Sequence, residues 1–339
     1  MMSFQRREIV LVPIVFALIS LVILPVFATG LPCSDDTLPH FYRTVQLLTL
    51  LKQGNPFLQW GPDLLRGYGY PIMAFYAPLT YWLLAGVQAV MGLAQAMQVT
   101  FFLALYAAGL GAYALARRYV GPLGALVAGA AYLFSPYLLY DAIQRGALPE
   151  TLALALIPWA LLVADRVQAR PSWRGIGLGA LLFALLILTH NVLPLFGLAL
   201  TGLWALLPLR PAAGWRGWWA QVWPVLLMLV LALGLTTFFW LPGLAELPFT
   251  QSRRDDPILH DWPRFEQHLV PPDKLVGWPD EPPDPQLLNP PVSRALGWGQ
   301  AALGLLGLWG VWVYPRRERR RRLWLLAGAT AVSIFFVTT

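Results

Sequence analysis

The sequence predicts an all-α protein that crosses a membrane many times. Of its 339 residues, 58% are hydrophobic and only 12% are charged, a composition typical of polytopic membrane proteins. Apolar runs alternate with short breaks that contain arginines, which predicts a bundle of about nine transmembrane helices with a further helix along the outer membrane surface. The apolar runs cover residues 9–29, 72–92, 98–116, 122–140, 149–165, 175–189, 192–207, 222–241, 297–314 and 323–339.

The net charge and the cysteine content exclude several classes of function. The formal net charge is +7, but the basic residues are spread over the breaks between apolar runs, so no nucleic-acid partner is expected. Cys33 is the single cysteine, which excludes an intramolecular disulfide and a cysteine-based zinc site. The first apolar run follows Arg6 and Arg7 and is long enough to span, so we expect a retained first helix rather than a cleaved signal peptide.

The positions of the arginines predict how the chain is threaded. Cytoplasmic loops of membrane proteins are enriched in arginine and lysine, so an even number of crossings should separate successive basic breaks. The 72–92 run must then stay on the outer side, and the 175–207 region must form two short spans joined by a turn at residues 189–191. The basic breaks, all expected on the cytoplasmic side together with the N-terminus, are Arg6/Arg7, Arg117/Arg118, Arg166–Arg174, Arg210/Arg216 and Arg316–Arg322.

The stretch after the first apolar run predicts an amphipathic helix that lies in the membrane interface, within a first outer loop spanning residues 30–97. Leu38 precedes a proline and is biased away from helical dihedral angles, so the helix should begin at Pro39 and end near Gly54. Its two faces differ in polarity, with Phe41, Val45 and Leu48 on one side and His40, Arg43 and Gln46 on the other.

Asp35 and Asp36 stand immediately before this helix, at the boundary of lipid and water. One of them could act as a general base toward a hydroxyl group, or the pair could hold a divalent cation such as Mg²⁺ or Mn²⁺. Two aspartates in this place could also be a solvated N-terminal cap that the helix dipole favours. The residue types alone leave these alternatives open.

A second outer turn, YDAIQRGALPETLA, contains Asp141, Arg145 and Glu150. Arg145 could bind a phosphate, and Glu150 could either coordinate a cation together with Asp36 or position Arg145. The alternative is an ion pair within a loop.

Two further stretches contribute candidate substrate-binding residues. Tyr76 belongs to an aromatic segment that could form the wall of a groove for a lipid tail or a sugar ring, with Arg66 adding a charge; interfacial anchoring is the alternative. His190, in LTHN, is either a polar residue at a helix break or a substrate contact.

The chain divides into three segments. Residues 1–242 form the expected transmembrane module, and residues 243–296, with eleven prolines, form an extended extracytoplasmic segment. Residues 297–339 supply further transmembrane helices. The last apolar run ends without a polar flank, so we expect a fragment of a longer protein.

Several segments, in this order, resemble a known family: SDDTLPHFYR, GYGYPIMAFYAPLTYWL, the run around YDAIQRGALPETLA, LTHN and FFWLPGLAEL. Over residues 9–250 the chain is similar to bacterial integral membrane proteins known as 6-pyruvoyl-tetrahydropterin synthase-related. Those proteins in turn resemble the GT-C superfamily of polyprenyl-phosphate-dependent glycosyltransferases. The pterin label is not matched by any chemistry in this sequence.

The resemblance implies a GT-C-like bundle in the bacterial plasma membrane that transfers a sugar, with inversion, from a polyprenyl-phosphate donor to an extracytoplasmic acceptor. It implies that Asp35 or Asp36 is the base or metal ligand, and that Arg145 with Glu150 holds the donor phosphate. His40, Arg43, Arg66, Tyr76 and His190 complete the expected substrate site. Expected partners are the lipid-linked sugar and membrane lipid, and no oligomeric state is predicted. A lipid-linked glycan transporter and a non-catalytic assembly protein are the alternatives.

Overall fold

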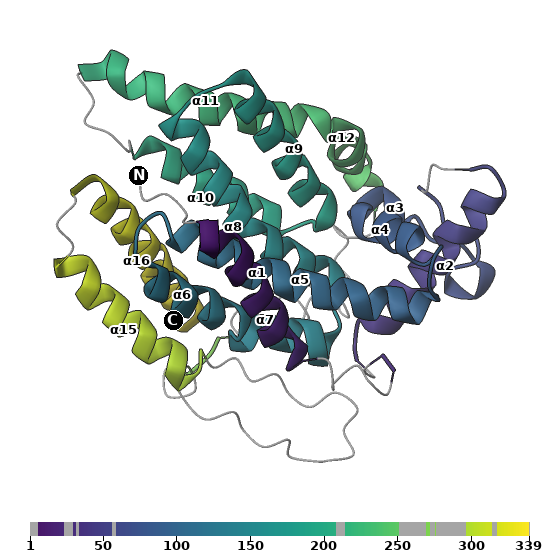
Figure 1. Ribbon diagram of the computed structural model, residues 1–339. Coiled ribbons are helices and arrows are strands. Elements are labelled where there is room, and N and C mark those ends of the chain that lie inside the picture. Colours follow the sequence, from purple (N-terminus) through teal and green to yellow (C-terminus); the bar gives the residue numbers. More distant parts are fainter. Residues whose placement is uncertain are drawn as a thin grey trace.

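The computed structural model is a bundle of α-helices (Figure 1). The structure describes residues 6–23, 30–31, 34–55, 59–207, 214–250, 269–271, 275, 296–313 and 317–338. Within these ranges there is no β-strand, and the only strand-like pairing is one isolated bridge between Gly61 and Tyr70. The all-α prediction is therefore confirmed for the part of the chain that is described.

Three of the described helices are long and apolar enough to cross a membrane: α5 (Leu93–Ala116), α8 (Leu148–Ala169) and α11 (Gly214–Leu235). α8 is the most buried of the three and packs against α5 and α11, as well as against α9 (Trp173–Thr189) and α10 (Leu193–Leu206). It therefore forms the central element of the bundle.

A fourth span is possible if a bent pair of helices counts as one crossing. α6 (Pro122–Leu133) is followed by α7 (Pro136–Leu139) and the π-helical turn η3 (Tyr140–Arg145), with a bend of 44°. The described residues thus provide three or four candidate spans, and the expected number of about nine is not confirmed. Several apolar runs form helices of 14–17 residues, which include α1 (Arg6–Leu21), α9, α10 and α15 (Trp298–Val313). At about 1.5 Å per residue these helices reach only some 21–26 Å, less than the hydrocarbon core.

Two chain breaks predicted from the positions of the arginines are present in the structure, although membrane crossing by α9 and α10 is not confirmed. The 72–92 run is broken into α3 (Ile72–Phe75) and α4 (Leu79–Val87), and nine residues of helix extend only about 14 Å, too short to cross. The 175–207 region forms α9 and α10, which meet at a break that begins at His190.

The helix expected in the membrane interface corresponds to α2 (Thr37–Lys52), which packs against α4. Part of its polar side is buried against the protein. His40 and Gln46 are buried, whereas Val45 is exposed. The reason is that the protein supplies hydrogen-bond partners for the polar face, Tyr81 for His40 and Asp63 for Gln46. Apolar residues of α2 are buried as well, with Leu47 and Leu50 in a core cluster, so the helix packs against the protein through both polar and apolar side chains.

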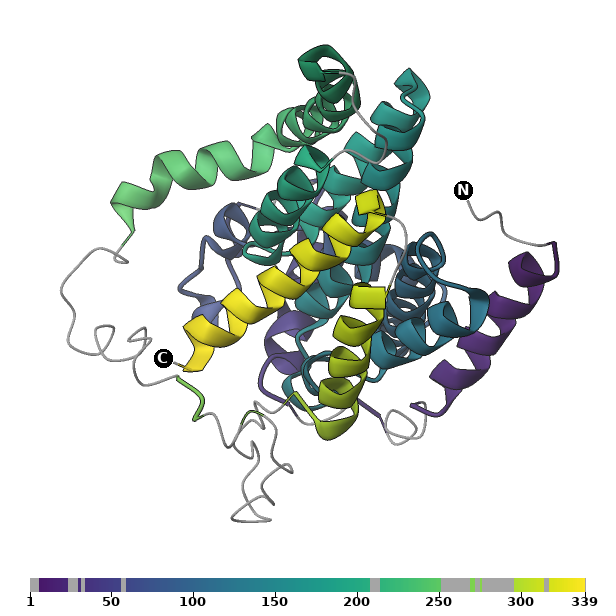
Figure 2. The ribbon, with the colours of Figure 1, turned by 90° about the vertical axis from the view of Figure 1, so that its left-hand side faces the viewer.

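The remaining described elements are η2 (Leu65–Gly67), α12 (Thr237–Glu246), η4 (Leu247–Phe249) and α16 (Arg317–Thr338). Figure 2 shows α15 and α16 side by side, and the two helices are in contact. Most of the predicted extracytoplasmic segment, residues 243–296, lies outside the described residues.

Candidate functional site

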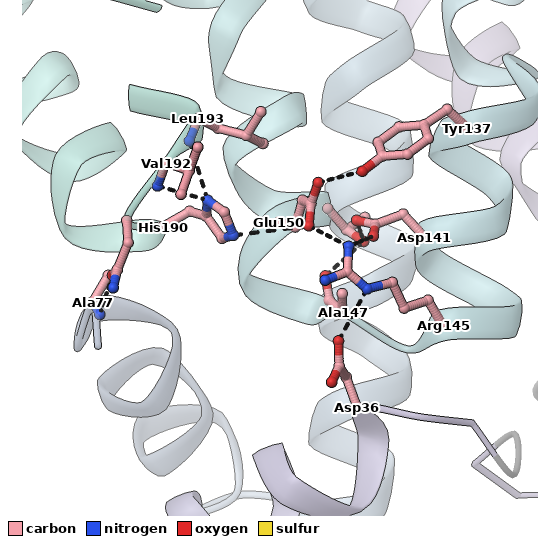
Figure 3. Close-up of polar contacts among 12 residues, drawn as sticks. Asp36, Ala77, Tyr137, Asp141, Arg145, Ala147, Glu150, His190, Val192 and Leu193 are labelled. Carbon is pink, nitrogen blue, oxygen red and sulfur yellow. Dashed lines mark hydrogen bonds and ion pairs between the residues drawn. The ribbon is translucent and has the colours of Figure 1, made fainter. Parts of the chain in front are cut away.

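Charged side chains from four parts of the sequence meet at the N-terminal end of α8 (Figure 3). Asp36 lies directly before α2, Asp141 and Arg145 lie on η3, Glu150 lies in the first turn of α8, and His190 lies between α9 and α10. We call these five residues the acid cluster.

The chain reaches this arrangement through a left-handed turn at Gly146. Its φ of +69° is a conformation that residues with a Cβ rarely adopt. A Cβ at this position would also lie 2.1 Å from the hydroxyl oxygens of Ser34 and Thr37. The turn therefore lets the beginning of α2 approach η3 closely, and the backbone N–H of Asp36 donates to the carbonyl oxygen of Arg145 at 2.9 Å.

Arg145 holds three carboxylates together. Its Nε lies 3.1 Å from Asp36 Oδ2, and its Nη1 lies 3.3 Å from Asp141 Oδ1 and 2.6 Å from Glu150 Oε2. Asp141 and Glu150 are almost fully enclosed, whereas the side chains of Arg145 and Asp36 are each 35% exposed. Asp36 is thus the carboxylate of the cluster that a ligand can approach.

Glu150 is fixed from the opposite side by Tyr137 and His190. The Tyr137 hydroxyl donates to Glu150 Oε1 at 2.5 Å, and His190 Nε2 lies 3.8 Å from Glu150 Oε2 (Figure 3). His190 Nδ1 accepts hydrogen bonds from the backbone N–H groups of Val192 and Leu193, both at 3.2 Å. The proton of a neutral His190 is therefore on Nε2, which faces Glu150. Burial lowers the pKa of His190 and outweighs the opposing effect of Glu150.

Three rings and one guanidinium group lie beside the acid cluster, where α2 meets α4. We call them the aromatic cluster, which consists of His40, Arg43, Tyr76 and Tyr81. His40 Nδ1 lies 2.9 Å from the Tyr81 hydroxyl, to which Arg43 Nη1 donates at 3.1 Å. The Arg43 guanidinium lies 4.5 Å from the centre of the Tyr76 ring. Burial, reinforced by the nearby Arg43 and Arg145, lowers the pKa of His40 to about 3. His40 is therefore neutral at physiological pH.

Most of the residues predicted from the sequence are brought together, but two lie apart. Asp36, Arg145, Glu150 and His190 meet in the acid cluster, and His40, Arg43 and Tyr76 meet in the aromatic cluster. Asp35 is exposed and forms no ion pair within the described ranges. Arg66 lies on η2, also exposed and away from the acid cluster. Of the adjacent aspartates, the structure places Asp36 in the cluster.

Three side chains that organise the site were not predicted as site residues from the sequence, although Tyr81 belongs to the aromatic segment and Asn191 to the predicted turn. Tyr137 and Tyr81 lie in apolar runs, where tyrosine is usually a packing residue. Asn191 accepts from the Ala77 N–H at 2.9 Å and donates to the Phe75 carbonyl oxygen at 2.5 Å, so it ties the α9–α10 break to the segment that carries Tyr76. The polar pair His190-Asn191 between two apolar runs was the available signal.

The predicted divalent-cation site does not fit the described residues. Within them, no group of three or more His, Cys, Asp or Glu side chains is arranged to hold a metal ion. The two expected ligands, Asp36 and Glu150, both contact Arg145, whose guanidinium lies where a shared cation would be placed. We therefore propose no chemical step that uses a metal ion at this site.

Comparison with known proteins identifies one family. The family described as "6-pyruvoyl-tetrahydropterin synthase related domain; membrane protein" matches residues 73–252, which include Tyr76, Arg145, Glu150 and His190. A search of curated proteins and a search of solved structures gave no significant match. Because the matched region covers more than half of the chain, this protein belongs to the membrane-protein family of the 6-pyruvoyl-tetrahydropterin synthase related domain.

Proposed function

We propose that this membrane protein is a GT-C-like glycosyltransferase that moves a sugar, with inversion, from a polyprenyl-phosphate donor to an extracytoplasmic acceptor. The resemblance between the 6-pyruvoyl-tetrahydropterin synthase-related family and the GT-C superfamily supports the proposal. The observation that carries it is the charge balance of the acid cluster, in which three carboxylates share one guanidinium.

This balance suits Asp36 to the role of general base. If a cation has only one carboxylate partner, protonation of that carboxylate leaves the cation unpaired. Arg145 contacts Asp141 and Glu150 as well, so it remains paired when Asp36 takes up a proton. Asp36 is also the exposed carboxylate of the three, within reach of an acceptor.

The proposed reaction is a single displacement. An acceptor hydroxyl oxygen forms a bond to the anomeric carbon, while the bond between that carbon and the phosphate oxygen breaks. Polyprenyl phosphate leaves with the electron pair, and the hydroxyl proton passes to Asp36. Tyr137 and His190 keep Glu150 in place, and Glu150 keeps Arg145 oriented toward Asp36.

The position of the cluster suits a substrate carried on a lipid. It lies at one end of the most buried spanning helix, where a lipid-borne donor can arrive from the bilayer and an acceptor from water. Two of the five basic breaks supply residues near the opposite end of α8, where Arg117 pairs with Glu8, and Arg118 and Arg322 pair with Asp165. By the positive-inside rule, the acid cluster is then extracytoplasmic.

Transport of a lipid-linked glycan is the alternative. A transport site is expected near the membrane midplane, whereas the charged residues of α8 lie in its first and last turns. This distribution favours chemistry at the surface of the membrane over passage through it.

The test is a pair of single substitutions in the full-length protein, assayed for sugar transfer from a polyprenyl-phosphate donor. Asp36→Asn should lower the rate by about 100-fold or more, the scale of general-base catalysis. Asp35→Asn is the matched control, because it removes the adjacent carboxylate, which forms no ion pair with any described residue. Its transfer rate should stay within about twofold of wild type. A folded Asp36→Asn protein with full activity would remove Asp36 as the base, and absence of transfer in the wild type would favour an assembly role.

A further inference from the structure

A cavity of about 500 Å³ lies between the outward face of α2 and the segment around η2, and we call it the α2 cavity. It is separate from the acid cluster, of which no member lines it. The lining residues are Pro39, Tyr42, Arg43, Val45, Gln46, Thr49, Asp63, Leu64, Leu65, Arg66 and Tyr70.

The charges that line the α2 cavity leave an excess of positive charge. Asp63 is held by Gln46, whose Nε2 donates to Asp63 Oδ2 at 3.0 Å while its Oε1 accepts from the Asp63 N–H at 2.8 Å. Among the residues that the structure describes, Arg43 contacts the neutral rings of His40, Tyr76 and Tyr81. Arg66 forms no ion pair with any residue that the structure describes. Two guanidinium groups therefore remain for an anion, in contrast to Arg145, which already contacts three carboxylates.

The rest of the wall is apolar and open. Tyr42, Val45, Leu65 and Tyr70 all rank among the large hydrophobic side chains that remain exposed. Exposed apolar surface of this kind marks a contact with lipid, ligand or another protein. A ligand that satisfies both parts of the wall needs an anionic head and a hydrocarbon chain.

The backbone holds Arg66 at the cavity in an unfavourable conformation. Leu65 and Arg66 have φ values of +51° and +61°, in the left-handed region that residues with a Cβ rarely adopt. Paired hydrogen bonds between Gly61 and Tyr70, at 2.9 and 3.0 Å, close the loop that contains them. Strain of this kind concentrates at ligand sites, where the surrounding structure maintains it.

We propose that the α2 cavity binds the phosphate head group of a membrane lipid, with Arg43 and Arg66 on the phosphate and the apolar wall on the first part of the chain. Planar guanidinium groups match phosphate oxygens in geometry and charge. Arg145 then organises the carboxylates, while lipid phosphate is recognised on α2 and η2. The inference concerns binding alone and stands whether or not the protein transfers sugar.

The experiment measures equilibrium binding of farnesyl phosphate to the full-length protein in nanodiscs of zwitterionic lipid, with farnesol and inorganic phosphate as comparison probes. Arg66→Gln should weaken farnesyl phosphate binding about tenfold, because a charge-assisted contact is lost. Lys52→Gln is the matched control, since Lys52 is an exposed cation of α2 that does not line the cavity. It should change affinity less than about twofold. Arg43→Gln should weaken binding by a similar factor to Arg66→Gln.

Each probe separates one part of the proposal. Farnesol should bind more weakly than farnesyl phosphate and be insensitive to Arg66→Gln. Inorganic phosphate should need a much higher concentration, and equal affinity for it would mean a free-anion site rather than a lipid site. Equal loss of affinity in Arg66→Gln and Lys52→Gln, or equal affinity for farnesol and farnesyl phosphate, would overturn phosphate recognition by the cavity. None of these readouts depends on Asp36 or on transfer activity.

Discussion

Two clusters of charged side chains lie at opposite ends of α8, and they differ in how their charges are balanced. Glu150 and Asp165 are fifteen residues apart on this helix, or about 22 Å at the usual helical rise. Glu150 belongs to the acid cluster. Asp165 belongs to what we call the basic cluster, which consists of Arg118, Tyr119, Asp165, Gln168 and Arg322.

In the basic cluster every charged group is enclosed and paired. Asp165 accepts from Arg118 and Arg322, and from the Tyr119 hydroxyl at 2.9 Å. Arg322 is fully buried, donates also to Gln168 and to the Leu207 carbonyl oxygen, and lies 5.0 Å from the centre of the Trp204 ring. The cluster joins the end of α5, the end of α8 and the beginning of α16. Such a network fixes how these helices pack.

The acid cluster has the opposite balance, with more carboxylates than cations and with both Asp36 and Arg145 partly exposed. A group in this environment can take up a proton or exchange a partner without leaving a buried charge alone. The two ends of α8 therefore differ in that the basic cluster is enclosed, whereas the acid cluster has charged side chains that are partly exposed.

The largest effect on stability is expected from Asp165→Asn. This change leaves two enclosed guanidinium groups without their carboxylate, and breaking a buried ion pair costs about 3–5 kcal/mol. Thermal unfolding of the detergent-solubilised protein measures the loss. Asp36→Asn is the matched variant at the other end of α8 and should cost no more than about 1 kcal/mol, as for an exposed pair. Equal losses in the two variants would remove the distinction between the clusters.

A smaller effect is expected from acidification to pH 4.5, because of His40 on α2. The pKa of His40 is lowered to about 3 in the folded protein from an ordinary value near 6.5. The unfolded chain therefore binds the proton first. The stabilisation from neutral His40 is fully present above pH 6.5 and is lost as the pH falls toward 3. The loss is about 1.4 kcal/mol per pH unit within that window.

The measurement is the free energy of unfolding between pH 7 and pH 4.5, compared with a His40→Gln variant. Glutamine keeps a hydrogen-bonding side chain and does not titrate, so its pH dependence should be shallower over this range. Parallel curves for the two proteins would show that His40 does not stay neutral as the pH falls.

The sequence predicted the acid cluster better than it predicted the basic one, for a physical reason. The requirement for an even number of crossings between basic breaks predicted a turn at residues 189–191. It also put His190 on the same side as Asp36, Arg145 and Glu150. The contact between Asp165 and Arg322 joins residues 157 positions apart, and no local pattern indicates such a pairing. The choice between Asp35 and Asp36 depends on the close approach of Gly146, which is again a tertiary contact.

The sequence pattern leaves two features of the fold undetermined, namely which face of α2 meets the protein and how many helices span the membrane. The amphipathic pattern of α2 indicates two faces but not which one meets the protein, and Tyr81 and Asp63 settle that by pairing with the polar side. Apolar runs alone do not show whether a helix is long enough to span. The bend between α6 and α7 and the short α9 and α10 reduce the number of candidate spans.

A smaller loss of stability than that of Asp165→Asn, and one that separates the two ends of α8 most cleanly, is expected from Gly146→Ala. Alanine at a φ of +69° costs about 1–2 kcal/mol, and its Cβ would displace the hydroxyls of Ser34 and Thr37. Asp36 should then shift away from Arg145, so transfer activity should fall more than stability does.

Gly177→Ala is the matched control, because that glycine lies within α9 and has nothing within 4 Å of an added Cβ. It should leave activity unchanged and stabilise the helix by up to about 1 kcal/mol. Leu161 of α8 and Leu325 of α16 belong to one apolar cluster beside the basic cluster, so cross-linking between cysteines at these positions measures the packing of α16. A Gly146→Ala protein that lost this cross-link would mean that the two ends of α8 are coupled rather than independent.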